Sequence, residues 1–282
     1  METPNLAGRV CLITGASSGI GRATAKGLAR MGATVVMVSR ADGEGAKAAD
    51  SIKASTGSDS VEFMPCDLSS LQSLRDFTTA FRERHKLLHV LINNAGGVYR
   101  PRRESVDGYE MTFAVNHLAG FLLTNLLLPD LKASAPSRII NVSSGAQEMG
   151  RIDFDDLQSA RDYKPFRAYA LSKLANVMFA YELARRLDGS DVTANVLHPG
   201  TVRTGFGDST DGLMRFFLQA IRPLLLTPEQ GAETPIYLAS SPEVETVTGK
   251  YFVNKKAVPS SPQSYDVDVA KRLWQASERM AG

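Results

Sequence analysis

Short apolar runs rich in β-branched residues alternate along the chain with longer segments that have the hydrophobic spacing of a helix. Continuously apolar runs predict strands, because a strand buried on both faces of a parallel sheet has no polar side to show. The predicted strands are residues 10–14, 34–39, 61–65, 90–93, 138–143, 192–198 and 250–253. Apolar residues at i, i+3 and i+4 predict helices between them, among them residues 20–31, 71–84 and 168–187.

Two further features refine this pattern. Ser69 with Gln72 three residues later has the form of a capping box and predicts a helix start. One segment breaks the alternation, because 10 of the 14 residues from 213 to 226 are apolar and follow a loop. This segment is either an ordinary core helix or a lid over an apolar pocket. As a lid, it would bring Phe216 and Phe217 against a substrate.

The composition is that of a folded globular protein. The 282 residues are 43% hydrophobic, and 32 Lys and Arg against 30 Asp and Glu give a formal net charge of +2. These values exclude a disordered or collagen-like chain, and the dispersed charge argues against a nucleic-acid partner. Cys11 and Cys66 lie inside apolar runs, so we expect them to be small core residues without a metal.

No segment predicts a membrane span. Residues 1–8 are too short and too polar for a signal peptide or an anchor. The longest apolar stretch, residues 121–128, contains Thr124 and Asn125 and stops at Pro129, well short of the roughly 18 residues that a span needs. We therefore expect a cytoplasmic protein that acts on a small molecule. The sequence does not decide between a monomer and a homo-oligomer.

The first predicted strand runs directly into a glycine-rich turn and then a helix. Gly15, Gly19 and Gly21 have the spacing Gly-x3-Gly-x-Gly, which differs from the standard dinucleotide fingerprint. Such a turn lets a phosphate approach the unpaired N–H groups of a helix N-terminus. The turn and the strand–helix alternation predict an α/β fold with a Rossmann-type doubly wound parallel sheet of about seven strands and helices on both faces. We expect one NAD(P)-binding domain over residues 1–282, with a lid insertion at about 203–227.

The end of the second strand predicts which dinucleotide binds. A carboxylate there would accept a hydrogen bond from the adenosine 2′-hydroxyl and repel a 2′-phosphate. Ser39 and Arg40 stand there instead, and the guanidinium of Arg40 suits a phosphate. We expect NADP(H), with NAD(H) as the alternative because the charge of Asp42 could oppose Arg40. Asp42 also has the residue type of an N-cap for the next helix.

Tyr169 and Lys173 are four residues apart on one predicted helix face. A free tyrosine has a pKa of about 10, and an adjacent cation favours its phenolate. We therefore expect Lys173 to lower the pKa of Tyr169 and make it a proton donor and acceptor. The same spacing recurs at Tyr251 and Lys255, but on a predicted strand and turn, where the two side chains are not helical neighbours. We treat this second pair as a coincidence.

Polar residues near neighbouring strand ends complete a candidate site. Ligands of doubly wound sheets bind at the carboxyl ends of the strands, where Ser143 and Ser144 could donate to a substrate oxygen. Asn93 and Asn94 end the fourth strand. Asn116 lies in the apolar helical pattern that follows, where an amide is unfavourable unless it is used.

Taken in order, these motifs resemble those of the classical short-chain dehydrogenase/reductase family across nearly the whole chain. The motifs are residues 14–21, 93–96, Asn116, Ser144, Tyr169 with Lys173, and the Pro-Gly-Thr-Val-Arg-Thr run at 199–204. The stretch 169–187, the His198-Pro199-Gly200 turn and the tail with Leu273 and Trp274 are most similar to the retinol-dehydrogenase-like branch. The 25-residue spacing from Ser144 to Tyr169 is also similar to that branch.

The resemblance implies a role for each site residue. Tyr169 would be the general acid/base, and Lys173 would lower its pKa and bind the nicotinamide ribose. Ser144 would polarise the substrate carbonyl, and Asn116 would position a proton-relay water. The turn, the strand ends and the resemblance together give these cofactor-binding residues: Gly15, Ser17, Ser18, Gly19, Ile20, Gly21, Ser39, Arg40, Asp67, Leu68, Asn94, Ala95, Gly96, Tyr169, Lys173, Pro199, Gly200, Val202 and Thr204. The expected substrate contacts are Ser144, Tyr169, Phe216 and Phe217.

These features predict an NADP-dependent oxidoreductase, such as a ketoreductase, that interconverts a hydrophobic alcohol and its ketone or aldehyde by hydride transfer. One alternative is a catalytically silent NADP(H)-binding sensor, against which the complete set of proton-handling residues argues. The other is an epimerase or dehydratase of nucleotide sugars, which shares the Tyr and Lys pair but has a longer chain. No His, Cys or Asp cluster has metal-ligand spacing. His198, beside Pro199, is interpreted as a turn residue.

Overall fold

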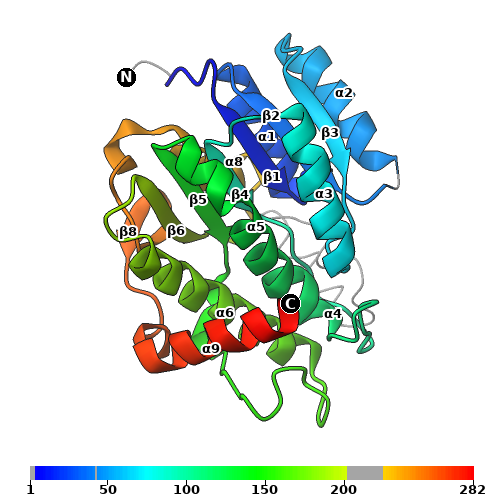
Figure 1. Cartoon of the computed structure of the whole chain (residues 1–282), viewed down its shortest axis with the longest axis vertical. Coiled ribbons are helices and arrows are strands. Elements are labelled where there is room, and N and C mark those ends of the chain that lie inside the picture. The colour runs from blue at the N-terminus through cyan, green and yellow to red at the C-terminus, as the bar shows by residue number, and fades with distance from the viewer. Residues whose placement is uncertain (1–3, 42, 202–224) are drawn as a thin grey trace.

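The fold is built on one sheet of eight strands (Figure 1). The structure is a computed structural model and describes residues 4–41, 43–201 and 225–282. The strand order is β3-β2-β1-β4-β5-β6-β7-β8. The strands are β1 (Val10–Thr14), β2 (Thr34–Ser39), β3 (Val61–Pro65), β4 (Val90–Asn93), β5 (Ser137–Val142), β6 (Val192–His198), β7 (Tyr251–Val253) and β8 (Lys256–Val258). All neighbours from β3 to β7 run parallel, and β8 returns antiparallel to β7.

Helices cover both faces of this sheet. They are α1 (Gly19–Arg30), α2 (Glu44–Thr56), α3 (Leu71–Arg84), α4 (Met111–Phe113), α5 (Ala119–Ala133), α6 (Pro165–Arg186), α8 (Pro228–Ser240) and α9 (Val267–Ala281). Shorter helical turns are η1 (Ala114–Leu118), η2 (Gly145–Met149), η5 (Pro242–Val244) and η6 (Pro262–Tyr265).

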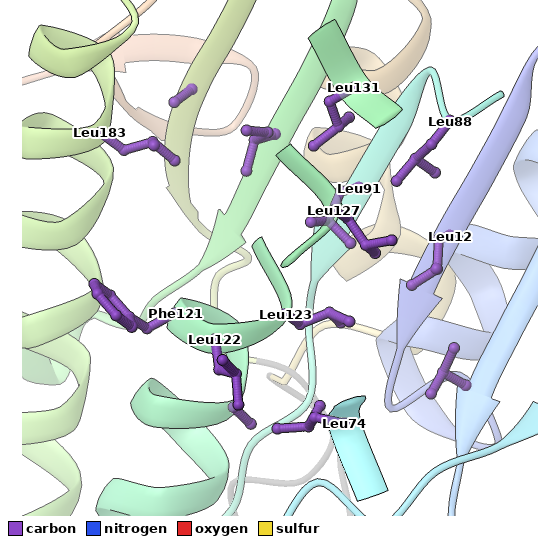
Figure 2. Close-up of a cluster of buried hydrophobic side chains, with 14 of the residues drawn as sticks. Leu12, Leu74, Leu88, Leu91, Phe121, Leu122, Leu123, Leu127, Leu131 and Leu183 are labelled. Carbon is purple, nitrogen blue, oxygen red and sulfur yellow. The ribbon is translucent and has the colours of Figure 1, made fainter. Parts of the chain in front are cut away.

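The alternation of side chains along each strand separates two hydrophobic cores. Leu12 of β1 points to the core built by α3, α5, α6 and α9. Ile13, its neighbour, points to the opposite core, built by α1, α2 and α8. Figure 2 shows the first core, where Leu12 and Leu91 of the sheet lie beside Leu123 and Leu127 of α5. The predicted doubly wound fold with helices on both faces is therefore confirmed.

The strand predictions are accurate where the runs are apolar and β-branched. Five predicted strands match β1, β2, β3, β4 and β6 residue for residue. The predicted strand 138–143 lies one residue later than β5, and 250–253 begins one residue before β7. β8 was not predicted, because it is a three-residue edge strand with exposed side chains. The sheet therefore has eight strands where about seven were expected.

Two helix-cap predictions are wrong. The N-cap of α3 is Ser70, whose Oγ accepts a hydrogen bond from Ser73 N at 3.2 Å. Ser69 instead donates through its hydroxyl to Asp67 at 2.7 Å, so its side chain is turned away from the helix end. The N-cap of α2 is Gly43 rather than Asp42, which lies outside the described residues.

The apolar stretch expected to stop at Pro129 belongs to a longer helical run. Pro129 lies inside α5, and α4, η1 and α5 together span Met111–Ala133. By length and composition alone this run could cross a membrane, with a mean hydropathy of 1.4 in its 18-residue window. However, 67% of that window is buried inside the fold, as in many core helices. The absence of a membrane span and the cytoplasmic location stay predictions.

Candidate active site

The carboxyl ends of the parallel strands from β1 to β6 surround one cavity of about 1180 Å³. The cavity lies where the sheet order reverses, since β1 leads to β2 on one side and β4 pairs with β1 on the other. Cavities for single drug-sized ligands are usually about 300–1,000 Å³. This cavity therefore exceeds the usual volume for a single drug-sized ligand.

Every cofactor residue predicted from the sequence that the structure describes lines this cavity. They are Gly15, Ser17, Ser18, Gly19, Ile20, Gly21, Ser39, Arg40, Asp67, Leu68, Asn94, Ala95, Gly96, Tyr169, Lys173, Pro199 and Gly200. The predicted contacts Val202, Thr204, Phe216 and Phe217 lie outside the described residues, as does most of the predicted lid.

The glycine turn is packed too closely to accept side chains. A Cβ on Gly21 would lie 2.3 Å from the carbonyl oxygen of Gly15. Gly15 has a φ of +65°, and a Cβ there would lie 2.8 Å from Ala95 Cα. Ser18, the N-cap of α1, makes no side-chain capping hydrogen bond, and the first turn of α1 holds no acidic residue. The N–H groups of this turn are therefore suited to an anion such as a pyrophosphate.

Thr14 and Asn94 hold this turn against the end of β4. The hydroxyl oxygen of Thr14 accepts from Asn94 N at 3.0 Å and from Ala95 N at 3.1 Å. The Asn94 amide donates back to Thr14 O at 2.8 Å and to Gly15 O at 3.2 Å. The sequence motifs at 14–21 and 93–96 therefore form one unit that shapes the phosphate end of the cavity.

Cations gather at the end of the cavity beside β2. Arg40 and Arg103 both line it, together with the single acidic side chain Asp67 among the described lining residues. Burial raises the pKa of Tyr99, and the charges of both arginines oppose that shift, which places all three side chains near one another. The hydroxyl of Ser39 is buried at the tip of β2 and has no partner within the described part of the chain. This arrangement suits a phosphate group.

Tyr169, Ser144 and Lys173 meet at the opposite end. Tyr169 is hydrogen-bonded to the side chain of Ser144. The Lys173 ammonium lies 5.5 Å from the centre of the Tyr169 ring and donates to Val142 O at 3.1 Å. Lys173 is 3% exposed, and burial lowers its pKa from 10.5 to about 8.

The expected lowering of the Tyr169 pKa is not found in this structure. Burial raises the pKa of Tyr169, and the hydrogen bond from Ser144 opposes that shift. The ammonium of Lys173 makes its own hydrogen bond to the main chain, and it lies 5.5 Å from the centre of the Tyr169 ring. The phenol is therefore protonated at neutral pH.

The two serines at the end of β5 have different environments. Ser143 is 3% exposed, and its hydroxyl donates to Lys173 O at 2.7 Å. Ser144 is the N-cap of η2, where its Oγ accepts from Ala146 N at 3.2 Å and faces Tyr169. Ser143 thus ties β5 to α6, and only Ser144 presents its hydroxyl beside Tyr169.

Asn116 lies in the π-helical turn η1, a rare form that often marks functional sites. Its Oδ1 accepts from Gly97 N at 2.8 Å, and its Nδ2 donates to Gly97 O and to Ser172 Oγ, both at 3.0 Å. Ser172 donates in turn to Tyr169 O at 2.7 Å. The Asn116 amide therefore joins the loop after β4 to the helix that carries Tyr169. Its role in holding a relay water stays a prediction.

Comparisons with known proteins identify the family. The family model described as short chain dehydrogenase matches residues 9–212. The chain belongs to the short-chain dehydrogenase family. It is 45% identical to human retinol dehydrogenase 14 over 98% of this chain and 87% of that protein. It is 43% identical to human polyprenol dehydrogenase over 97% of this chain and 85% of that protein.

A solved structure agrees with this assignment. The Pseudomonas aeruginosa RhlG/NADP active-site complex has a TM-score of 0.72 and 30% identity, covering 89% of this chain and 97% of that one. The protein is thus a short-chain dehydrogenase/reductase of the retinol-dehydrogenase-like branch, and it acts on CH–OH and C=O groups.

Several cavity residues of this short-chain dehydrogenase were not predicted from the sequence. His198, expected to be a turn residue, is the last residue of β6 and lines the cavity. Its Nδ1 is buried without a partner among the described residues, and burial lowers its pKa, helped by the charge of Lys173. Tyr99, Met149 and Phe166 also line the cavity. Their only sequence signal was proximity to the motifs at 93–96, Ser144 and Tyr169.

The second Tyr and Lys pair is correctly dismissed. Tyr251 is buried in β7, while Lys255 lies in the following turn with a φ of +63° and pairs with Glu233 at 2.8 Å. Neither residue lines the cavity. Within the ranges 4–41, 43–201 and 225–282, no group of His, Cys, Asp and Glu could hold a metal ion.

Replacing Lys173 by Met should stabilise the folded protein, and the gain in stability over the wild type should be larger at pH 7 than at pH 10. Folded Lys173 has a pKa of about 8 against an ordinary 10.5, so between these values the unfolded chain binds a proton that the folded protein lacks. Wild-type stability therefore rises with pH across this window, and the advantage of Lys173→Met shrinks. Urea unfolding of both proteins at pH 7 and pH 10 measures the difference. Lys250→Met, at an exposed lysine, is the control, and an advantage that grows with pH would contradict the burial effect.

Proposed function

We propose that the protein is an NADP-dependent oxidoreductase that interconverts an apolar alcohol and its ketone or aldehyde, with Tyr169 as the general acid/base. The observation that carries this proposal is the meeting of Ser144, Tyr169 and Lys173 in the cavity that the phosphate-binding turn also lines. A sensor needs the turn but not the proton-handling side chains, so this combination favours catalysis.

The adenosine end supports NADP(H) over NAD(H). Arg40 and Arg103 outnumber Asp67 among the described charged residues there, and Asp67 already accepts two hydrogen bonds from Ser69. The buried hydroxyl of Ser39 offers a further donor for a 2′-phosphate. NADP is also the ligand named for the related RhlG structure.

The catalytic end handles the proton. When bound, the nicotinamide supplies a hydride to the carbonyl carbon or accepts one from the alcohol. The protonated phenol of Tyr169, which burial favours, gives its proton to the carbonyl oxygen during reduction. When a substrate binds, the Ser144 hydroxyl turns its single hydrogen from Tyr169 to the same carbonyl oxygen, while its Oγ still accepts from Ala146 N. The Lys173 cation over the ring stabilises the phenolate that remains.

The surroundings of Tyr169 support an apolar substrate. Met149 and Phe166 line the cavity and are 64% and 47% exposed, and the Phe166 ring lies 6.4 Å from the Tyr169 ring. Val115 adds a further apolar side chain. Exposed apolar surface beside a reactive group favours a substrate chain that removes it from water. The names of the retinol and polyprenol dehydrogenase relatives point to the same substrate class.

Changing Tyr169 to Phe tests the proposal directly. The variant lacks only the phenolic hydroxyl, so turnover should fall by at least about 100-fold while the affinity for NADPH stays nearly unchanged. Activity is measured with a panel of apolar ketones, aldehydes and alcohols, and affinity by quenching of Trp274 fluorescence. Tyr251→Phe is the matched control and should stay active. Undiminished turnover in Tyr169→Phe would refute the assignment, and tight NADPH binding without turnover of any substrate by the wild type would favour the sensor.

Arg40 should set the cofactor preference. A charge-assisted contact with the 2′-phosphate contributes roughly 1.5–3 kcal/mol, or about a 10- to 150-fold preference for NADP(H). Arg40→Ala should remove most of it, and Arg40→Asp should reverse it through repulsion. The measurement is kcat/KM with both cofactors at a fixed substrate concentration. A wild-type enzyme that prefers NAD(H) would overturn the prediction.

Phe166 should contribute to selection by substrate size. Removing its ring takes away apolar contact worth about 1 kcal/mol, so Phe166→Ser should lower kcat/KM for long-chain alcohols by roughly fivefold. Short-chain alcohols, which do not reach the ring, should be affected less. Val267→Ser changes an apolar side chain of similar exposure on α9 and serves as the control. Equal losses along the chain-length series would exclude this contact.

A further inference from the structure

A chain of buried hydrogen bonds connects the C-terminal helix to Asn116. Ser277 of α9 lies with its Oγ 2.9 Å from Nε2 of His117, and Nδ1 of His117 lies 3.2 Å from Oδ1 of Asn176. Asn176 of α6 donates through Nδ2 to the main-chain carbonyl of Asn116 at 2.9 Å. The four residues are between 0% and 6% exposed. The chain thus runs entirely inside the protein.

The direction of every bond in this chain is fixed. A carbonyl oxygen only accepts, so Asn176 must turn its Nδ2 to Asn116 and its Oδ1 to His117. His117 Nδ1 therefore carries a proton. Burial lowers the pKa of His117 to about 4, so the ring is neutral and its Nε2 accepts from the Ser277 hydroxyl. All donors point toward Asn116, an arrangement in which successive hydrogen bonds strengthen one another.

The end of the chain stands beside the catalytic groups. A Cβ built on Gly96 would lie 3.2 Å from Oδ1 of Asn116 and 3.1 Å from Nζ of Lys173, so both groups face the same point of the cavity wall. The Asn116 amide also holds Gly97 and, through Ser172, the main chain of Tyr169. A displacement of Asn116 would therefore move both the wall against Lys173 and the helix that carries Tyr169.

The surroundings of the chain are apolar. The His117 ring lies 5.0 Å from Phe113, 6.3 Å from Phe121 and 6.2 Å from Phe179. Buried polar groups among aromatic rings cost stability unless each is paired, and apolar residues would fill this interface at lower cost. Packing alone therefore does not account for a polar chain in this place.

We propose that Asn176, His117 and Ser277 are positioning residues, which fix the Asn116 carbonyl and make the catalytic centre depend on the docking of α9. The inference rests on the proposed function, because it assigns these residues to the site in which Tyr169 acts. None of the three lines the cavity, so their effect passes through Asn116.

Two variants and a matched control test the proposal. Ser277→Ala removes the first donor, and Asn176→Asp removes the donor to Asn116 while keeping an acceptor for His117. Ser264→Ala is the control, because Ser264 is 1% exposed and also makes two hydrogen bonds, to Ser260 and Ser261 O, but has no link to Asn116. Full-length proteins are compared by steady-state kinetics with NADPH, by thermal unfolding, and by the ¹⁵N shifts of His117.

Loss of one hydrogen bond in the chain should lower kcat by about threefold to tenfold for Ser277→Ala, and Asn176→Asp should lower it further. The KM values for substrate and NADPH should change little, and Ser264→Ala should keep the wild-type kcat despite a similar loss of thermal stability. The ¹⁵N shifts should show the proton on Nδ1 of His117 in the wild type.

A wild-type kcat in Ser277→Ala, equal effects of Ser277→Ala and Ser264→Ala, or a proton on Nε2 would overturn the proposal. If Tyr169→Phe is inactive, these outcomes contradict only the positioning role and not the proposed function. Failure of the proposed function instead appears as turnover that survives in Tyr169→Phe, whatever the three variants do.

Discussion

The burial of helix α6 is the constraint on which the catalytic end of the molecule depends. Of its 22 residues, 16 are buried, so the helix has almost no face toward water. Polar side chains on such a helix must find partners inside the protein. Ser172, Lys173 and Asn176 all do so, with groups on β5 and on the helical run before α5. The position of Tyr169 is therefore set by several elements at once, as its proposed acid–base role requires.

This burial has a cost that falls on Lys173. Its ammonium is removed from water, and the group to which it donates among the described residues, the main-chain carbonyl of Val142, is neutral. A buried cation without a carboxylate is unfavourable for folding. The cation lies over the ring of Tyr169, where the proposed function uses it to stabilise the phenolate. The burial that lowers the stability of the fold at Lys173 is the same burial that shifts its pKa, and shifted pKa values are common at functional sites.

The strands and the strand-end motifs could be predicted because their signals are local. A continuous β-branched run such as residues 34–39 is recognisable without its neighbours. The motif residues of the site lie at strand ends, and a parallel sheet brings all these ends to one edge. β8 and the cap at Ser70 were missed because they depend on packing and on competing hydrogen bonds, such as that of Ser69 with Asp67. The raised pKa of Tyr169 was missed for a related reason, since burial is a tertiary property.

His198 and Asn176 show the same limit at the site. The sequence around Asn176 does not reveal its partner, and only the crossing of α6 with η1 brings it to Asn116. His198 lies at the end of a correctly predicted strand, yet its buried Nδ1 is visible only in three dimensions. Site residues whose partners lie far away in the sequence are therefore the ones that sequence patterns do not identify.

The order of the strands also fixes the order of chemical environments along the cavity. Across β2, β1, β4 and β5, the lining changes from the cation Arg40, through the glycine turn and Asn94, to Ser144. Beyond Ser144 come Tyr169 and the apolar side chains of Met149 and Phe166. A ligand that is anionic at one end, uncharged at its reactive centre and followed by an apolar partner matches this sequence of environments. Reversing the two ends would put a phosphate against Phe166 and an apolar chain against Arg40, which desolvation disfavours on both counts.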